Sequence, residues 1–402
     1  MVVVGPPSGR SEPDKGGGRL VAVVSFSHAV QHVYSAILPL TYPFVVVEFH
    51  VSYVLLGLML SIAGITGGLL QGAVGFYSRV PARWLLSLQN VLLAAATVAG
   101  AIAPGFNAFG AARCVGSIVS SPQHPVGSEI LSRRFPQRRS TVLSWHVAGG
   151  SMGTVMVPMV ASLAFVHLGW RMTLALFALP VLLGAVLVAV FLQDRPPVRP
   201  PGQASLSRSM LRRGTLMVLI ASTVAAGGRG LGVLNAYVPI YLRNGLGLPT
   251  VTVGLVFTIL LLGSVVGPVL AGAVADRVGA RRIIVVCYLV GGAAVAVFAS
   301  VGANLMALLA AAVAVGLFAY AESPLLQSLF AASIGGVGRS AYGLFFAIAY
   351  GLGSLWAVVI GTLVDRFGFS AGFYMMAGSF GIAAAVLVLD SLMSKAWPQA
   401  AA

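Results

Sequence analysis

The feature of the sequence that most limits its fold is the recurrence of apolar stretches along almost all of its 402 residues. Each stretch has about 20 residues or more, which as a helix crosses a hydrocarbon core of about 30 Å. Only 8% of the residues are charged, whereas a water-soluble surface needs roughly a quarter to a third. The sequence therefore excludes a soluble globular protein and predicts an all-α membrane protein that crosses the bilayer many times.

The apolar runs, bounded by glycine, proline and charge clusters, predict twelve transmembrane helices. These spans cover 21–47, 52–78, 84–104, 107–131, 141–166, 170–193, 214–242, 250–275, 283–301, 305–332, 341–364 and 370–392. The long internal break at 194–213 is rich in proline and arginine, which is typical of a linker. The prediction is two six-helix bundles, 21–193 and 214–392, with this linker between them and with tails at 1–20 and 393–402.

Basic residues indicate which side of the membrane each loop faces. Most of the 24 lysine and arginine residues fall in the two tails, the linker and alternate short loops, and the opposite loops hold only Arg171, Arg243 and Arg366. By the positive-inside rule both termini are predicted to be cytoplasmic. The formal net charge of +15 therefore reports orientation. It does not predict nucleic-acid binding, because the basic residues are scattered over short loops.

The two halves resemble each other at an offset of about 200 residues, a repeat that is typical of secondary transporters. The matching pairs are Gly72-Ala-Val with Gly272-Ala-Val, Pro39 with Pro239, Arg139-Ser140 with Arg339-Ser340, and Gly153 with Gly353. No single pair is specific. Their nearly constant offset favours an internal duplication.

Between the eighth and ninth spans the chain reads Gly272-Ala-Val-Ala-Asp276-Arg277-Val-Gly279-Ala-Arg281-Arg282. This resembles the signature loop of the major facilitator superfamily, in which an acid and several bases latch neighbouring helices on the cytoplasmic side. A loop that is basic only for topology would explain the arginines, but not the aspartate with its spaced glycines. The same place in the first half carries no acid. The candidate gating residues are Gly272, Asp276, Arg277, Gly279, Arg281 and Arg282, with Asp365 and Arg366 from a similar element at the outer end of the eleventh span.

Within this superfamily the sequence is most similar to bacterial transporters of the fosmidomycin-resistance type. The resemblance rests on Ser27-His28, Tyr42-Pro43, Ser120-Ser121-Pro-Gln-His124-Pro125, Gly149-Gly150 through Pro158, and Gly343 through Gly353. It implies the major facilitator fold and the export of drugs or organic anions, driven by the proton gradient. Two positions depart from the pattern: His32 stands where the family often has an acid, and Val157 precedes Pro158 where antiporters have glycine.

Ionisable side chains inside the membrane are costly and therefore mark candidate functional residues. His32, Arg229 and Glu322 each lie about 15 Å or more from the nearest cytoplasmic helix end at 1.5 Å per residue. They belong to the first, seventh and tenth spans, which the resemblance implies line a central cavity together with the fourth. A transporter's substrate site is expected there, near the midplane.

Arg229 stands out because it lies within Gly227-Gly228-Arg229-Gly230-Leu-Gly232, where glycine makes the helix easy to unwind. A guanidinium there could grip a carboxylate, phosphate or phosphonate through two hydrogen bonds. Alternatively, Arg229 forms a buried ion pair with Glu322, and the glycines serve close packing. Both arrangements could exist in alternating states. Further candidates for binding substrate are Arg113, His28, His32, Gln31, His124, His146, Asn235, Tyr237, Tyr350 and Trp356.

Proton coupling is predicted to involve Glu322 and His32. A desolvated carboxyl group can titrate near neutral pH, and an unperturbed histidine has a pKa near 6.5. A permanently ionised Glu322 paired with Arg229 or Arg113 is the alternative. Some of the histidines could serve only to hydrogen-bond helix backbones.

The sequence thus predicts a secondary active transporter that moves a small organic anion, such as a carboxylate, a phosphonate or an anionic drug, by alternating access with proton coupling. The alternative is a proton-driven multidrug antiporter for apolar or cationic compounds, in which Glu322 would bind the substrate. An enzyme is not expected, because HExxH and phosphate-loop motifs are missing from the sequence. We expect a monomer that needs no cofactor or metal and whose partners are the substrate, protons and the lipid bilayer.

Overall fold

The computed structural model describes residues 17–77, 80–135, 138–193, 212–334, 345 and 347–396. Within this part of the chain every regular element is a helix, as the apolar runs predict. Nine of the described helical segments are long and apolar enough to cross a membrane, and one of these, Val142–Phe191, contains two predicted spans. The predicted linker at 194–213 lies outside the described residues except for its last two, as do most of the N-terminal tail and the end of the C-terminal tail.

The first half contains seven described helices that cover the first six predicted spans. They are α1 (Gly17–Glu48), α2 (Tyr53–Tyr77), α3 (Ala82–Ala101), α4 (Phe106–Val119), α5 (Gln123–Arg134), α6 (Arg139–Leu176) and α7 (Ala178–Phe191). The fifth and sixth spans run together in α6 through a turn at Gly169, where φ is +73°. A positive φ favours glycine, which carries no Cβ to clash with the backbone.

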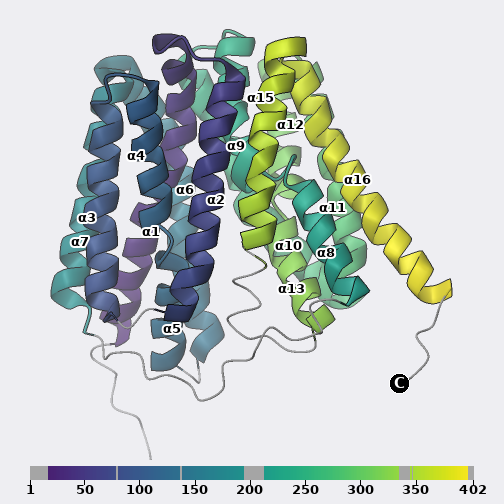
Figure 1. Cartoon of the computed structure of the whole chain (residues 1–402), viewed down its shortest axis with the longest axis horizontal. Coiled ribbons are helices and arrows are strands. Elements are labelled where there is room, and N and C mark those ends of the chain that lie inside the picture. The colour runs from purple at the N-terminus through teal and green to yellow at the C-terminus, as the bar shows by residue number, and fades with distance from the viewer. Residues whose placement is uncertain are drawn as a thin grey trace, which may run out of the picture.

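The second half covers the remaining six spans, three of which are composed of shorter pieces. Its elements are α8 (Arg213–Ala225), η3 (Gly230–Leu234), α9 (Asn235–Ile240), η4 (Tyr241–Gly245), α10 (Thr250–Val278), α11 (Ala280–Ser300), α12 (Leu305–Ala319), α13 (Glu322–Ile334), η5 (Ala347–Gly351), η6 (Leu352–Leu355), α15 (Trp356–Phe367) and α16 (Phe369–Ala396). Figure 1 shows α1 to α7 on one side of the molecule and α8 to α16 on the other.

The predicted span 107–131 is divided into α4 and α5 by a break at residues 120–122. Pro122 and Pro125 lack the N–H groups that a continuous helix needs in its interior. The seventh span is interrupted after Ala225 and the tenth after Ala319, and both interruptions position charged groups.

The two halves meet along two seams, one between α2 and α15 and the other between α6 and α10. Glycine permits the closest approach: a Cβ placed on Gly57 of α2 would lie 2.2 Å from the carbonyl oxygen of Ala357. The reverse contact is equally close, since a Cβ on Gly361 of α15 would lie 2.2 Å from the carbonyl oxygen of Tyr53. Small residues at such crossings allow helix backbones to pack directly in a membrane.

Hydrogen bonds between the described parts of the two halves gather toward the end where α1 finishes and α2 begins. Tyr237 donates its hydroxyl to the Tyr53 carbonyl oxygen at 3.2 Å, and Asn244 donates to the Pro43 carbonyl oxygen at 3.2 Å. Further along α2, Ser61 and Ser354 each donate to the other's carbonyl oxygen, at 2.8 and 3.0 Å. The molecule is therefore closed at the end that the sequence predicts to face outward.

Candidate functional site

A cavity of about 270 Å³ lies between the two halves, and its lining on α2 runs from Leu60 to Gln71. It therefore begins beside the Ser61–Ser354 contact and extends away from the closed end. Its polar lining residues are Gln31, Gln71, Arg113, Ser117, Ser120, Ser121 and His124 from the first half, and Arg229, Tyr350 and Ser354 from the second. Among the described residues that line this cavity, two are arginines and none is a carboxylate.

Arg229 is buried and held on several sides. Its Nε donates to Glu322 Oε1 in an ion pair, and its two terminal nitrogens donate to the Ala349 carbonyl oxygen at 2.8 Å and to Ser222 at 2.7 and 2.8 Å. The guanidinium carbon also lies 4.7 Å from the centre of the Tyr350 ring. These contacts fix the orientation of the guanidinium group at the cavity wall.

A break in the seventh span places Arg229 in this position. After α8 ends at Ala225, the backbone of Arg229 is extended, with φ −60° and ψ 130°, and η3 begins at the next residue. The flanking glycines permit close packing on both sides. A Cβ on Gly228 would lie 2.6 Å from the Met376 carbonyl oxygen, and one on Gly230 would lie 2.3 Å from the Tyr320 ring.

Glu322 is the first residue of α13 and is 1% exposed. Its Oε1 accepts the hydrogen bond from Arg229, while its Oε2 has no hydrogen-bond partner within the described residues. It is not among the residues that line the cavity, so it lies behind Arg229. The ion pair that the sequence offered as one interpretation of Arg229 is formed in this conformation.

Arg113 of α4 differs from Arg229 in its surroundings. It lines the same cavity and is partly exposed. Its Nε donates to the Tyr42 hydroxyl at 3.2 Å. Within the described residues no carboxylate forms an ion pair with it, so its positive charge is the less compensated of the two.

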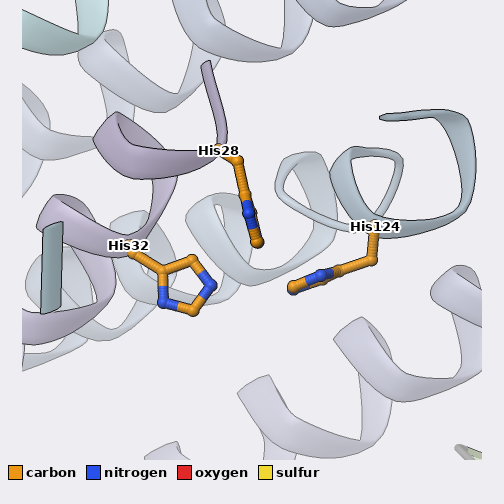
Figure 2. A group of neighbouring side chains, drawn as sticks. All are labelled: His28, His32 and His124. Atoms are coloured by element: carbon orange, nitrogen blue, oxygen red, sulfur yellow. The ribbon is translucent and has the colours of Figure 1, made fainter. Parts of the chain in front are cut away.

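Four predicted site histidines from α1, α5 and α6 lie together beside the cavity. The ring centre of His28 is 4.5 Å from that of His32, 4.9 Å from that of His124 and 4.2 Å from that of His146. Figure 2 shows the rings of His28, His32 and His124 converging on one space. His124 lines the cavity, whereas His28 and His146 are buried.

A buried polar network next to these histidines was missed by the sequence reasoning. Asn90 donates to the Ser27 hydroxyl at 3.1 Å, and that hydroxyl donates to Gln123 Oε1 at 2.9 Å. Gln89 also donates to Gln123 Oε1, at 3.0 Å. The signal was available in the sequence, because amide side chains inside apolar spans are as unusual as charges.

Three other predicted binding residues lie outside the cavity lining. Tyr237 is buried at the closed end, where its hydroxyl also donates to the Ala357 carbonyl oxygen at 2.8 Å. Trp356 donates its indole N–H to the Thr223 carbonyl oxygen at 3.0 Å, and Asn235 accepts a hydrogen bond from Tyr320. Their roles in substrate binding stay predictions.

The loop that resembles the superfamily signature joins α10 to α11 through Gly279, where φ is +96°. Arg281 pairs with Asp390 of α16 at 2.8 Å. The other carboxylate oxygen of Asp390 lies 3.5 Å from Arg213 Nε, so Asp390 forms ion pairs with two arginines. Asp276 and Arg277 are exposed and form no hydrogen bond or ion pair within the described part of the chain. Gly272, Arg282 and Arg366 likewise stay candidates only.

Asp365, the acid of the outer motif, connects the two halves. Its Oδ1 accepts a hydrogen bond from the Tyr53 N–H at 3.0 Å, and its Oδ2 accepts one from the Val54 N–H at 2.8 Å. These are the first two residues of α2, whose N–H groups have no partner within their own helix. An acid from the second half therefore caps a helix of the first half.

Comparisons with known proteins agree on one family. The family model described as Major Facilitator Superfamily matches residues 24–252 and 218–400. The fosmidomycin resistance protein of Escherichia coli (strain K12) is 25% identical over 362 residues, which cover 86% of each chain.

Solved transporter structures show the same fold. The crystal structure of the nucleoside transporter NupG superimposes with a TM-score of 0.75 at 14% identity, covering 93% of this chain and 98% of that one. A bacterial homologue of the human lysosomal transporter Spinster, in an inward-facing and unoccupied conformation, gives a TM-score of 0.73 at 14% identity over 94% and 98% of the two chains.

Proposed function

The chain belongs to the Major Facilitator Superfamily and is a multi-pass membrane transporter, and we propose that it carries a small organic anion through the cavity between its halves. The observation that supports this substrate class is the charge of the cavity wall. Arg113 and Arg229 line it, and no carboxylate does among the described lining residues. A guanidinium group at bilayer depth favours an anionic partner, because an unpaired charge there is costly.

Arg113 is the better placed of the two arginines to receive the anion. It is partly exposed to the cavity, and its described hydrogen-bond partners are the hydroxyls of Tyr42 and Tyr34, which carry no charge to offset its own. A guanidinium fork matches a carboxylate or phosphonate through two parallel hydrogen bonds. The anion would thus neutralise the less compensated charge first.

Arg229 and Glu322 suggest how protons would be coupled to this binding. If the anion also draws Arg229 away, the buried Glu322 carboxylate loses its counter-ion, and an ionised carboxylate without a partner is costly in such a site. Glu322 would then take up a proton. In this scheme proton uptake and anion binding favour each other, so the two would travel together.

The substrate class is tested by reconstituting the protein into liposomes and measuring the flux of fosmidomycin, a phosphonate that the name of the Escherichia coli relative suggests as a probe. Arg113→Ala should abolish the flux, and Arg113→Lys should retain part of it because the positive charge remains. Arg133→Ala is the matched control, since Arg133 is an exposed residue whose ion-pair partner is Glu129 at 3.9 Å.

Unchanged flux in the Arg113→Ala protein would contradict the anion proposal, provided that wild-type liposomes transport the probe. A wild-type protein that transports cationic dyes but no carboxylate or phosphonate would favour the drug-antiporter alternative. That alternative needs a protein carboxylate in contact with the cationic substrate. Glu322 lies behind Arg229 in this conformation and does not line the cavity.

The proposal also includes the membrane in which the protein lies and the side that its termini face. We place the protein in a bacterial inner membrane as a monomer with both termini in the cytoplasm. On this orientation the closed end faces outward and the cavity belongs to an inward-facing state.

A further inference from the structure

His28, His32 and His124 offer one ring nitrogen each, and these nitrogens lie within 4.8 Å of one another. The first two residues are four apart on α1 and so share one helix face, a spacing that also places paired histidines on zinc in other proteins. The third comes from α5, just after the break at residues 120–122. Figure 2 shows that the three rings approach from two helices and face a common centre.

Hydrogen bonds fix which nitrogen of the two α1 histidines carries the proton. His28 Nδ1 lies 2.8 Å from the His146 carbonyl oxygen, which can only accept, so Nδ1 donates. His32 Nδ1 lies 2.8 Å from the Thr154 hydroxyl oxygen. That hydroxyl donates its own proton to the Gly150 carbonyl oxygen at 3.1 Å, so it accepts from His32.

Each neutral ring therefore presents an unprotonated Nε2. Both Nε2 atoms are buried, and neither has a hydrogen-bond partner within the described residues. A buried acceptor without a partner is unusual and needs an explanation. Histidines that bind metal have this arrangement, because the nitrogen that does not ligate donates to a carbonyl or another acceptor and so orients the ring.

We propose that His28, His32 and His124 form a binding site for a divalent transition metal ion of the zinc class, with Nε2 of His28 and of His32 as two of its ligands. Imidazole nitrogen suits Zn²⁺, Cu²⁺ or Ni²⁺, whereas Mg²⁺ and Ca²⁺ prefer oxygen. The sequence alone predicted no metal, because His124 follows ninety-two residues after His32 and only the fold brings them together.

The rings would have to draw closer to complete the coordination. Zinc–nitrogen bonds of about 2.0–2.1 Å hold tetrahedral ligands roughly 3.4 Å apart, whereas the three ring nitrogens lie within 4.8 Å of one another. His124 is exposed to the cavity beside the helix break, so its ring has room to turn. His28 and His32 are already held by their Nδ1 hydrogen bonds.

The fourth position of such a site opens toward the cavity, because His124 is itself a lining residue. Three neutral imidazoles leave the double charge of the ion uncompensated, and the described cavity lining has no carboxylate to offset it. An anionic oxygen of the cavity's occupant would supply the missing ligand. This last step rests on the proposed function, whereas the three-histidine site does not.

The site is tested by titrating the purified full-length protein in detergent with Zn²⁺ alone, against a chromogenic chelator. Wild type should bind about one ion per chain. His32→Ala and His124→Ala should each weaken binding at least tenfold. Thr154→Val, which removes the acceptor of His32 Nδ1 but keeps all three ligands, should weaken it by about 10 to 100-fold. Size-exclusion profiles check the fold of each variant, and exposed His124 is the least disruptive site to change.

His167→Ala is the control and should bind Zn²⁺ as wild type does, since His167 is exposed elsewhere. Co²⁺ in place of Zn²⁺ should give the visible absorption of a tetrahedral site. Binding that survives His32→Ala and His124→Ala, or that is absent in wild type, overturns the proposal. Because no anion is added, failure here leaves the anion proposal standing, and failure of fosmidomycin flux leaves the metal site standing.

Discussion

The Arg229–Glu322 pair shows how an intramembrane charge is tolerated at the scale of single residues. Each partner is at most 4% exposed at its side chain, and serine and backbone oxygens complete the shell of the arginine. A buried pair of this kind contributes little relative to two apolar residues, but the loss of one partner leaves a bare charge.

Glu322→Ala should therefore be strongly destabilising, by about 3–5 kcal/mol, because Arg229 keeps its charge without a carboxylate. The double variant Arg229→Met with Glu322→Leu should recover most of that loss. Thermal unfolding of the purified variants in one detergent measures both. If the double variant unfolds at the temperature expected from adding the losses of the single variants Arg229→Met and Glu322→Leu, the pair does not act as a unit.

The identity of these residues could be predicted from the sequence, but their partners could only partly be predicted. An arginine among glycines inside an apolar span is visible without a structure, and Glu322 was an obvious counter-ion. The pairing of Arg113 with tyrosine hydroxyls, and of Asp390 with both Arg281 and Arg213, depends on how separate helices pack. Local sequence patterns carry little information about such contacts.

At the scale of helices, the apolar pattern locates the elements well where they are continuous. α10 (Thr250–Val278) and α11 (Ala280–Ser300) match the predicted spans 250–275 and 283–301 within a few residues. The pattern fails where a span breaks, as between α4 and α5, because hydrophobicity is unchanged across the break. Those interruptions position His124, Arg229 and Glu322, and glycine and proline mark them in the sequence where hydrophobicity does not.

The cap that Asp365 places on α2 gives a prediction at this scale. Capping interactions contribute about 1 kcal/mol, which corresponds to roughly a fivefold change in an equilibrium. Asp365→Ala should therefore shift the population toward states open at the outer end. Spin labels are placed at Val47 and Phe367, which are 62% and 69% exposed. The fraction of molecules with the longer label-to-label distance should be about fivefold larger in Asp365→Ala than in wild type.

Cys114 and Cys287 are replaced first in that experiment so that only the two introduced sites are labelled. Asp365→Glu is the matched control, because it keeps the carboxylate and should retain part of the cap. An unchanged distance distribution in Asp365→Ala would show that the cap does not hold the outer end closed.

At the scale of the whole molecule, the closed end and the cavity together correspond to one half of the alternating-access cycle that we propose. The reciprocal hydrogen bonds of Ser61 and Ser354 mark where the closed region meets the cavity. Transport requires this contact to separate when the outer end opens.

A disulfide between Ser61→Cys and Ser354→Cys, in a background without Cys114 and Cys287, should therefore stop fosmidomycin flux on oxidation and restore it on reduction. Binding of the probe in detergent should persist, since the cavity stays accessible. Each single cysteine variant, treated with the same oxidant, is the control. Full flux through the oxidised double variant would mean that the two serines stay together throughout the cycle.

Of the two cavity arginines only Arg229 has a carboxylate partner, and this difference determines how the membrane potential acts on the transporter. With Arg229 neutralised by Glu322, the empty cavity carries the single charge of Arg113. A bound monoanion cancels that charge, and the proton that Glu322 takes up restores it. One elementary charge in a membrane potential of 100 mV corresponds to about 2.3 kcal/mol. Voltage would then act alike on the empty and on the loaded carrier, so cotransport of one monoanion with one proton would be electroneutral and only the concentration gradients of the proton and the anion would drive it.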